Sequence, residues 1–239
     1  MTAGLVALGT VGPGCTTNEA GRVPDSTNSG AVAAVETTRP GADSATGART
    51  PQSAPRVVLL GTSLTAGLGL DPSDAYPALL QEKADSAGLR VQIVSAGLSG
   101  ETSAGALRRA AWVLDQPAAL VVLEVGANDG LRGVDPDSTY ANLVALVQVV
   151  QRTQPAATVV LVQMEAPTNL GTSYTTRFHE AYLRASATTG VPLLPFILDG
   201  VAGDARFNQA DGIHPNIEGS KRVADTMWRS LGAQLRALP

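Results

Sequence analysis

Residue types that build several common functional sites are scarce in this chain of 239 residues. Cys15 is the only cysteine, which excludes an intramolecular disulfide and a thiolate metal site. His179 and His214 are the only histidines, so a histidine-rich metal centre is excluded too, although a site built from carboxylates alone stays open. No apolar run reaches 18 residues, which argues against a transmembrane span.

Basic residues are fewer than acidic residues in this chain. The chain has 17 basic and 21 acidic residues, a formal net charge of −4, and no basic patch that would neutralise phosphates. We therefore expect no nucleic-acid partner.

Aromatic residues make up only 4% of the chain, while hydrophobic residues reach 44%. This composition supports a sizeable core built mainly from Val, Leu and Ala.

The composition divides the chain into residues 1–55 and residues 56–239. The first part is rich in Ala, Gly, Ser, Thr, Asn and Pro without periodicity, which predicts a flexible tail or linker. An apolar stretch before Cys15 resembles a short export signal, but no Lys or Arg precedes it and Gly12-Pro13-Gly14 fits a cleavage site poorly. We favour an exported protein, periplasmic or lipid-anchored through Cys15, with a cytoplasmic location as the alternative.

The second part alternates short apolar runs with longer amphipathic stretches. Strands are predicted at residues 57–60, 91–94, 120–124, 158–163 and 192–196. Helices are predicted at about residues 74–86, 102–114, 137–151, 174–189 and 218–238, with Asp137-Ser138 and Thr172-Ser173 as N-caps. This alternation predicts an α/β fold, a three-layer α/β/α sandwich with about five parallel strands.

In an open parallel sheet, ligands bind beyond the carboxyl ends of the strands. The segments that follow the predicted strands there are residues 61–67, 96–102, 126–130 and 211–216. Each has an ordinary structural explanation when it is taken alone. Ser63 can cap a helix, residues 128–130 and Gly100 can form turns, and His214 can be a surface imidazole.

Together these residues indicate nucleophilic catalysis. A serine hydroxyl needs a base to remove its proton, and the base needs a third group to fix its tautomer. His214 follows a strand end, and Asp211 lies three residues before it, so one loop presents both groups. Asn128 and Gly100 add an amide side chain and an unobstructed backbone N–H for a developing oxyanion.

At this point the chain resembles the SGNH/GDSL hydrolases, whose four motif blocks occur here in the same order. The similarity runs from about Val57 to near the C-terminus, and Asp211-x-x-His214 is its most specific element. Two further segments resemble the arylesterase, thioesterase I and lysophospholipase branch: Gly97-Leu98-Ser99-Gly100-Glu101-Thr102-Ser103 and Ala166-Pro167-Thr168-Asn169-Leu170-Gly171.

The resemblance implies a flavodoxin-like fold and a serine hydrolase that cleaves esters or thioesters without a metal or organic cofactor. It implies that Ser63 is the nucleophile, His214 the base and Asp211 its partner. The backbone N–H groups of Ser63 and Gly100 and the amide of Asn128 would form the oxyanion hole. The expected partner is a small-molecule ester or thioester; the residues give no indication of an oligomeric state.

One residue departs from the family pattern. The first block of these hydrolases usually reads Gly-Asp-Ser-Leu, whereas this chain has Gly61-Thr62-Ser63-Leu64. Asp211 already orients the histidine, so Thr62 leaves the triad intact. The replacement changes the hydrogen bonding that stiffens the nucleophile turn.

Other functions fit the sequence less well. The Gly-x-Ser-x-Gly elbow of α/β-hydrolases is absent, because Thr65 occupies the position of its last glycine. A dinucleotide site is disfavoured because Pro72 follows the glycines at 67 and 69 where that motif needs a glycine. Two alternatives stay open: a carbohydrate O-acetylesterase, and a non-catalytic binding protein on the same fold.

Several side chains near these motifs are expected to have supporting roles. We interpret His179 as a structural or surface residue, and Trp112 and Trp228 as core packing. We expect the acyl pocket to be walled by residues around Leu98, by residues 131–134 and by residues 168–174, because all of them follow strand ends.

Overall fold

The computed structural model describes residues 53–239. Almost all of the expected tail, including Cys15, lies outside these residues, so the tail, its boundary and the membrane tether stay predictions. No helix within the described part of the chain combines the length and the apolar character needed to cross a bilayer.

A five-stranded parallel sheet forms the centre of the described residues, with strand order β2-β1-β3-β4-β5. The strands are β1 (Arg56–Gly61), β2 (Gln92–Gly97), β3 (Leu120–Glu124), β4 (Thr158–Val162) and β5 (Leu193–Leu194). Every residue of β3 is buried, as is all of β1 except its first residue. Continuous apolar runs suit these strands because both faces of a parallel sheet are covered.

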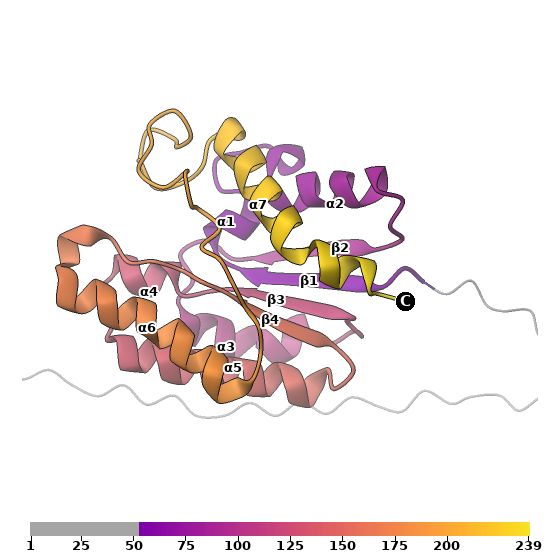
Figure 1. The fold of residues 1–239 in the computed structure, drawn as a ribbon, viewed down its shortest axis with the longest axis horizontal. Helices are drawn as coiled ribbons and strands as arrows, with labels where there is room; N and C mark the ends of the chain where they lie inside the picture. The colour runs from indigo at the N-terminus through magenta and orange to yellow at the C-terminus, as the bar shows by residue number, and fades with distance from the viewer. Residues whose placement is uncertain (1–52) are drawn as a thin grey trace, which may run out of the picture. The chain divides into compact units, whose positions relative to one another are not determined.

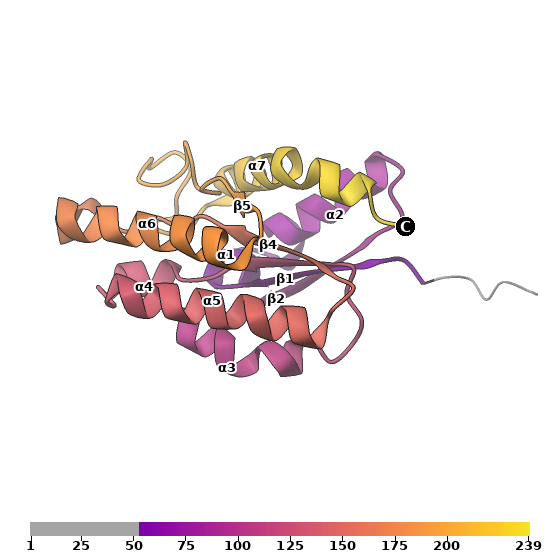
Figure 2. The same ribbon diagram turned by 60° about the horizontal axis from the view of Figure 1, so that its bottom comes forward.

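Helices cover both faces of the sheet, which confirms the predicted three-layer sandwich (Figure 1). Helices α2 and α7 lie on one face, and α3, α5 and α6 lie on the other, as Figure 2 shows from a second direction. Their bounds are α2 (Tyr76–Ser86), α3 (Ser103–Val113), α5 (Pro136–Thr153), α6 (Thr172–Thr189) and α7 (Ile217–Arg236).

The hydrophobic periodicity of the sequence did not predict the short elements. The structure adds α1 (Ser63–Ala66), α4 (Ala127–Leu131) and two 3₁₀ turns, η1 (Pro72–Asp74) and η2 (Thr168–Leu170). Helices of one turn are too short to display a repeat of 3.6 residues. Strand β5 is shorter than predicted because Pro192 and Pro195 flank it, and proline cannot donate to a ladder.

Both predicted N-caps were wrong by one to three residues. Helix α5 begins at Pro136 after Asp135, since proline is preorganised for the first helical position. Asp137 therefore lies in the first turn. Helix α6 begins at Thr172, and Gly171 occupies its N-cap position.

The prediction that Trp112 packs in the core was also wrong, because its side chain is 77% exposed. Helix α3 buries Ala106 and Ala110, four residues apart, and a residue two positions after Ala110 points to the opposite side. Trp228 packs against the core while staying partly exposed, in agreement with its expected role.

Truncating a core residue tests this packing. Leu123 is fully buried in β3, so Leu123→Ala should lower the free energy of unfolding by about 2–5 kcal/mol through lost contacts and a residual cavity. Leu183 is 48% exposed on α6, and Leu183→Ala should change it by no more than about 0.5 kcal/mol. Urea unfolding of both variants checks this, and equal effects would contradict the described core.

Candidate active site

The segments that follow β1, β2, β3 and β5 meet at the carboxyl edge of the sheet, beside α1 (Figure 1). Ser63 is the first residue of α1, which starts two residues after β1 ends at Gly61. Its side chain is almost buried, with 8% of the residue exposed. Ser63 therefore lies beyond the carboxyl end of a strand, where ligands bind in open parallel sheets.

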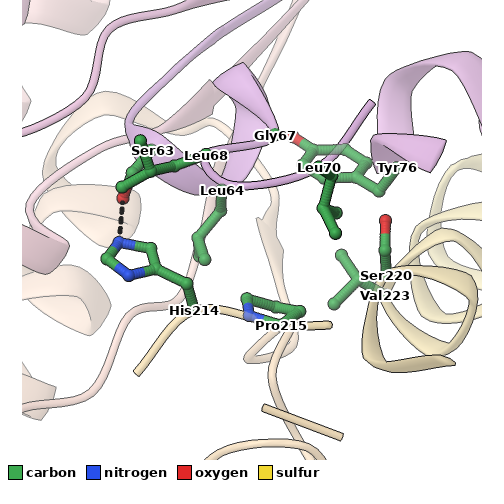
Figure 3. A pocket seen from close by; sticks show the side chains of 10 residues that line it. All are labelled: Ser63, Leu64, Gly67, Leu68, Leu70, Tyr76, His214, Pro215, Ser220 and Val223. Atoms are coloured by element: carbon green, nitrogen blue, oxygen red, sulfur yellow. Dashed lines mark hydrogen bonds between the residues drawn. The ribbon is translucent and has the colours of Figure 1, made fainter. Parts of the chain in front are cut away.

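The Ser63 hydroxyl lies against the imidazole of His214, as Figure 3 shows. The distance from Ser63 Oγ to His214 Nε2 is 2.9 Å, although 151 residues separate the two in sequence. On the other side of the ring, Nδ1 lies 2.6 Å from Asp211 Oδ2. The three predicted triad residues therefore form one continuous chain of hydrogen bonds.

The carboxylate of Asp211 determines the tautomer of the imidazole. A carboxylate only accepts hydrogen bonds, so Nδ1 of His214 must carry a proton toward it. In the neutral ring Nε2 is then an acceptor, and the Ser63 hydroxyl donates to it. This is the proton arrangement that a serine nucleophile with a histidine base requires.

Hydrogen bonds hold Asp211 in its ionised form. His214 Nδ1 lowers the pKa of the Asp211 carboxyl to about 2, with further contributions from the backbone N–H groups of His214 and Ile213. Those two N–H groups lie 3.0 and 2.9 Å from Asp211 Oδ1. Asp211 thus binds the backbone of its own loop through Oδ1 and the imidazole of His214 through Oδ2.

The loop that carries Asp211 and His214 is fastened at both ends. Gln209 Nε2 donates to the carbonyl of Leu68, just after α1, at 2.7 Å. Asn216 caps α7 by accepting from the N–H of Gly219 at 3.0 Å. The first bond ties the loop of the base directly to the segment after the nucleophile.

A buried carboxylate lies behind the nucleophile turn. Glu124, the last residue of β3, is fully buried. Its Oε2 accepts from the N–H of Thr62 at 3.0 Å and from the N–H of Thr65 at 3.3 Å. The Thr62 hydroxyl donates to Oε1 at 2.9 Å, and the Thr65 hydroxyl donates to Oε2 at 2.7 Å. Thr62 therefore replaces the usual aspartate with a donor to Glu124.

The surroundings of Glu124 explain two further sequence features. A Cβ at Gly61 would collide with Thr65 Oγ1 and Glu124 Oε2, so only glycine fits there. Burial raises the pKa of the Glu124 carboxyl above its usual value, and its four hydrogen bonds partly oppose this effect. The role of Glu124 was not predicted from the sequence, although a glutamate inside a buried apolar run was a usable signal.

The two remaining oxyanion candidates lie on neighbouring segments. Asn128, in α4, donates from Nδ2 to the carbonyl of Glu101 at 3.0 Å, which orients its amide. Gly100 has a φ of +77°, a conformation that favours glycine, and a Cβ there would meet nothing closer than an Arg132 nitrogen at 3.6 Å. The hydrogen bond between Asn128 and Glu101 joins the segments that follow β3 and β2.

An ion pair stabilises the segment that carries Gly100. Arg109 of α3 contacts Glu101, with 2.6 Å between Nη2 and Oε2. The same nitrogen donates to the carbonyls of Gly61 and Ala96, the ends of β1 and β2. Because Arg109 and Glu101 are both mostly buried, we infer that they position the oxyanion segment against the strand ends.

Two cavities of very different size touch Ser63. The smaller one, drawn in Figure 3, also touches His214 and has a volume of about 10 Å³, roughly the space for a single water. The larger has a volume of about 480 Å³, within the usual range for ligand pockets. It is lined by Ser63, Leu64, Ala127, Asn128, Leu131, Met164, Glu165, Ala166, Pro167, Thr168, Asn169, Phe196, Leu198, Ala202, Gly203, Gly212 and Ile213.

The residues expected to wall the acyl pocket are divided between two cavities. Leu131, Thr168 and Asn169 line the larger cavity, whereas Leu98 lines a different groove beside β2. Residues 164–167 and the segment from Phe196 to Gly203 were missed. These segments carry no catalytic motif, so only their position after β4 and β5 could have pointed to them.

His179 takes no part in the Ser63 chain of hydrogen bonds. It is exposed on α6, and its Nδ1 lies 2.7 Å from Glu165 Oε1, which agrees with the expected surface role. Within residues 53–239, no group of three or more His, Cys, Asp or Glu side chains is arranged to hold a metal ion.

The buried Glu124 carboxylate leads to a stability prediction. Glu124→Leu would leave the buried N–H groups of Thr62 and Thr65 without an acceptor, so unfolding free energy should fall by at least about 2 kcal/mol. Glu124→Gln is the matched control, since its amide oxygen replaces Oε2 and its nitrogen donates to the Thr62 hydroxyl. Urea unfolding at pH 7 measures both, and a Leu variant as stable as the Gln variant would contradict this role.

The Glu124 carboxyl should also make the stability of the protein depend on pH. The folded-state pKa of Glu124 is raised above 4.5, so its contribution to stability is present below 4.5 and is lost as pH rises through the folded-state value. Glu124→Gln cannot ionise. The unfolding free energy of the Gln variant relative to the unmodified protein should therefore increase as pH rises above 4.5.

Comparisons with known proteins identify the family of the chain. Residues 59–222 match the model of the GDSL-like lipase/acylhydrolase family. The esterase TesA of Pseudomonas aeruginosa is 39% identical over 184 residues, which cover 76% of this chain and 90% of that protein. Thioesterase 1/protease 1/lysophospholipase L1 of Escherichia coli is 37% identical over 180 residues, covering 75% and 84%.

A solved structure extends the likeness to the fold. The psychrotrophic esterase EstA from Pseudoalteromonas, inhibited by monoethylphosphonate, superimposes with a TM-score of 0.72 at 34% identity. The match covers 76% of this chain and 98% of EstA. The family match over residues 59–222 includes every segment that meets at the Ser63 edge of the sheet. The chain belongs to the GDSL-like lipase/acylhydrolase family.

Proposed function

We propose that the protein is a carboxylic ester hydrolase that works through an acyl-enzyme on Ser63. The observation that carries this proposal is the hydrogen-bond chain from Ser63 Oγ to His214 Nε2 and from His214 Nδ1 to Asp211. A serine hydroxyl becomes a useful nucleophile when a correctly oriented base accepts its proton. The esterase relatives support the same reaction class.

The reaction proceeds in two steps. Ser63 Oγ attacks the ester carbonyl carbon while its proton moves to His214 Nε2, and the carbonyl oxygen becomes an oxyanion. The oxyanion collapses, the bond to the alcohol breaks, and His214 returns the proton to the leaving oxygen. Water then attacks the acyl carbon while His214 takes its proton, the bond from that carbon to Ser63 Oγ breaks, and His214 returns the proton to Ser63 as the carboxylic acid leaves.

Three donors are assigned to the oxyanion: the N–H groups of Ser63 and Gly100 and the side-chain amide of Asn128. The bond from Asn128 Nδ2 to the Glu101 carbonyl uses one amide hydrogen and leaves the other available. Because this bond and the Arg109–Glu101 pair exist before substrate binds, the donors need little reorganisation during the reaction.

The sizes of the two cavities support an assignment of the acyl group to the larger one. The smaller cavity holds no more than a water, so the larger cavity beside Ser63 and Asn128 is assigned to the acyl chain. A volume of about 480 Å³ with mostly apolar walls far exceeds what an acetyl group fills. This favours acyl chains of several carbons over a carbohydrate O-acetylesterase. Thioesters and lysophospholipids have the same acyl half and are included in the proposal.

Replacing the nucleophile is the primary test. Ser63→Ala removes the attacking oxygen, so hydrolysis of p-nitrophenyl hexanoate should fall about 10⁴-fold or more. Ser138→Ala, at an exposed position on α5, is the control and should hydrolyse it at the normal rate. Rates measured by p-nitrophenol release would overturn the proposal if Ser63→Ala kept a substantial fraction of the activity.

The oxyanion assignment is tested through Asn128. Loss of one oxyanion donor typically lowers turnover by about 10²–10³, so Asn128→Ala should show that decrease in kcat with a much smaller change in KM. Steady-state kinetics on p-nitrophenyl hexanoate separates the two parameters. A variant with near-normal kcat would remove Asn128 from the oxyanion hole.

A further inference from the structure

Charge is distributed unevenly around the larger cavity. Among the described residues that line it, Glu165 alone has an ionisable side chain. The other polar residues in the wall are uncharged, and most of the wall is apolar. A single carboxylate in such surroundings is a strong determinant of which substituents enter, because few other groups compensate its field.

The carboxylate of Glu165 is held in place without being neutralised by a permanent cation. Its Oε1 lies 2.7 Å from His179 Nδ1, and its side chain is 34% exposed. Within residues 53–239, no lysine or arginine forms an ion pair with Glu165, and His179 is its one partner of this kind. The pairing with α6 restricts where the carboxylate can move.

The position of Glu165 in the chain places it on the acyl side of the site. Residues 164–169 follow the carboxyl end of β4, and β4 is the neighbour of β3, whose following segment carries Asn128. An acyl chain bound in this cavity would therefore share it with Glu165. We propose that Glu165 determines specificity by excluding acyl groups that carry a negative charge and admitting neutral or cationic ones. This inference rests on the proposed function.

Arg132 creates the opposite charge on another side of the site. Its guanidinium donates to the Gly100 carbonyl at 2.8 Å, and Arg132 is not part of the cavity wall. Because only the acyl half of the ester is assigned to the cavity that Glu165 lines, a negative charge on the leaving group is not subject to the same exclusion. The discrimination should depend on which half of the ester carries the charge, and this separates it from an effect of net protein charge.

The test compares three esters of equal acyl length: p-nitrophenyl hexanoate, the mono-p-nitrophenyl ester of adipate, and 3-carboxy-4-nitrophenyl hexanoate. The first is neutral, the second has an anionic acyl group, and the third has an anionic leaving group. Glu165→Gln should raise kcat/KM for the adipate ester relative to hexanoate by about tenfold. The ratio for the third ester should change by less than about twofold, since its charge is not in the acyl half.

Glu180→Gln is the matched control, because Glu180 is exposed on α6 next to His179 and does not line the cavity. It should leave both ratios unchanged. An ester of 6-(trimethylammonio)hexanoate should respond in the opposite direction, with a lower relative kcat/KM in Glu165→Gln. A second measurement needs no variant: raising the salt concentration should increase the relative rate of the adipate ester in the unmodified protein.

Failure of this inference is distinguishable from failure of the proposed function. If the unmodified protein does not cleave p-nitrophenyl hexanoate, the esterase proposal itself is wrong. If hexanoate is cleaved but the adipate-to-hexanoate ratio is the same in the unmodified protein and Glu165→Gln, the role of Glu165 is overturned. An equal change in Glu180→Gln would overturn it too, because the effect would then come from net charge.

Discussion

The carboxylate of Glu124 lies where the ends of β1 and β3 meet α1, and it accepts hydrogen bonds from the N–H and hydroxyl groups of both Thr62 and Thr65. These bonds satisfy backbone donors in a turn too short to satisfy them itself, and buried donors without partners are costly. Ser63 lies between the two threonines, so the same bonds set the orientation of the nucleophile. A hydroxyl at position 62 suits this arrangement because it donates to the buried carboxylate.

The other parts of the site depend on the geometry of a parallel sheet. Strand ends from distant parts of the sequence share one edge, and short segments after them supply Ser63, Gly100 and Asn128. Side chains join these segments to one another: Arg109 and Glu101 beside β2, and Asn128 across to the Glu101 carbonyl. The assembled edge holds hydrogen-bond donors in place before substrate arrives, which is the condition for electrostatic stabilisation of a transition state.

Much of the fold was predictable because its physical signals are local. Apolar runs predicted the buried strands, and the Asp211-x-x-His214 spacing predicted one loop with both groups of the base. Contacts between distant residues were not predictable from one sequence, as the exposed Trp112 illustrates. The role of Glu124 was missed for the same reason: it acts through the turn that it contacts, and it belongs to no motif.

The His214–Asp211 pair should make Ser63 the most reactive hydroxyl of the protein. Covalent labelling with a fluorophosphonate, followed by mass spectrometry of the digested protein, identifies the reactive oxygen without assuming a natural substrate. We expect one phosphonyl group per chain, on the peptide that contains Ser63. A stoichiometric adduct on a different residue, or no adduct on a protein that hydrolyses esters, would contradict it.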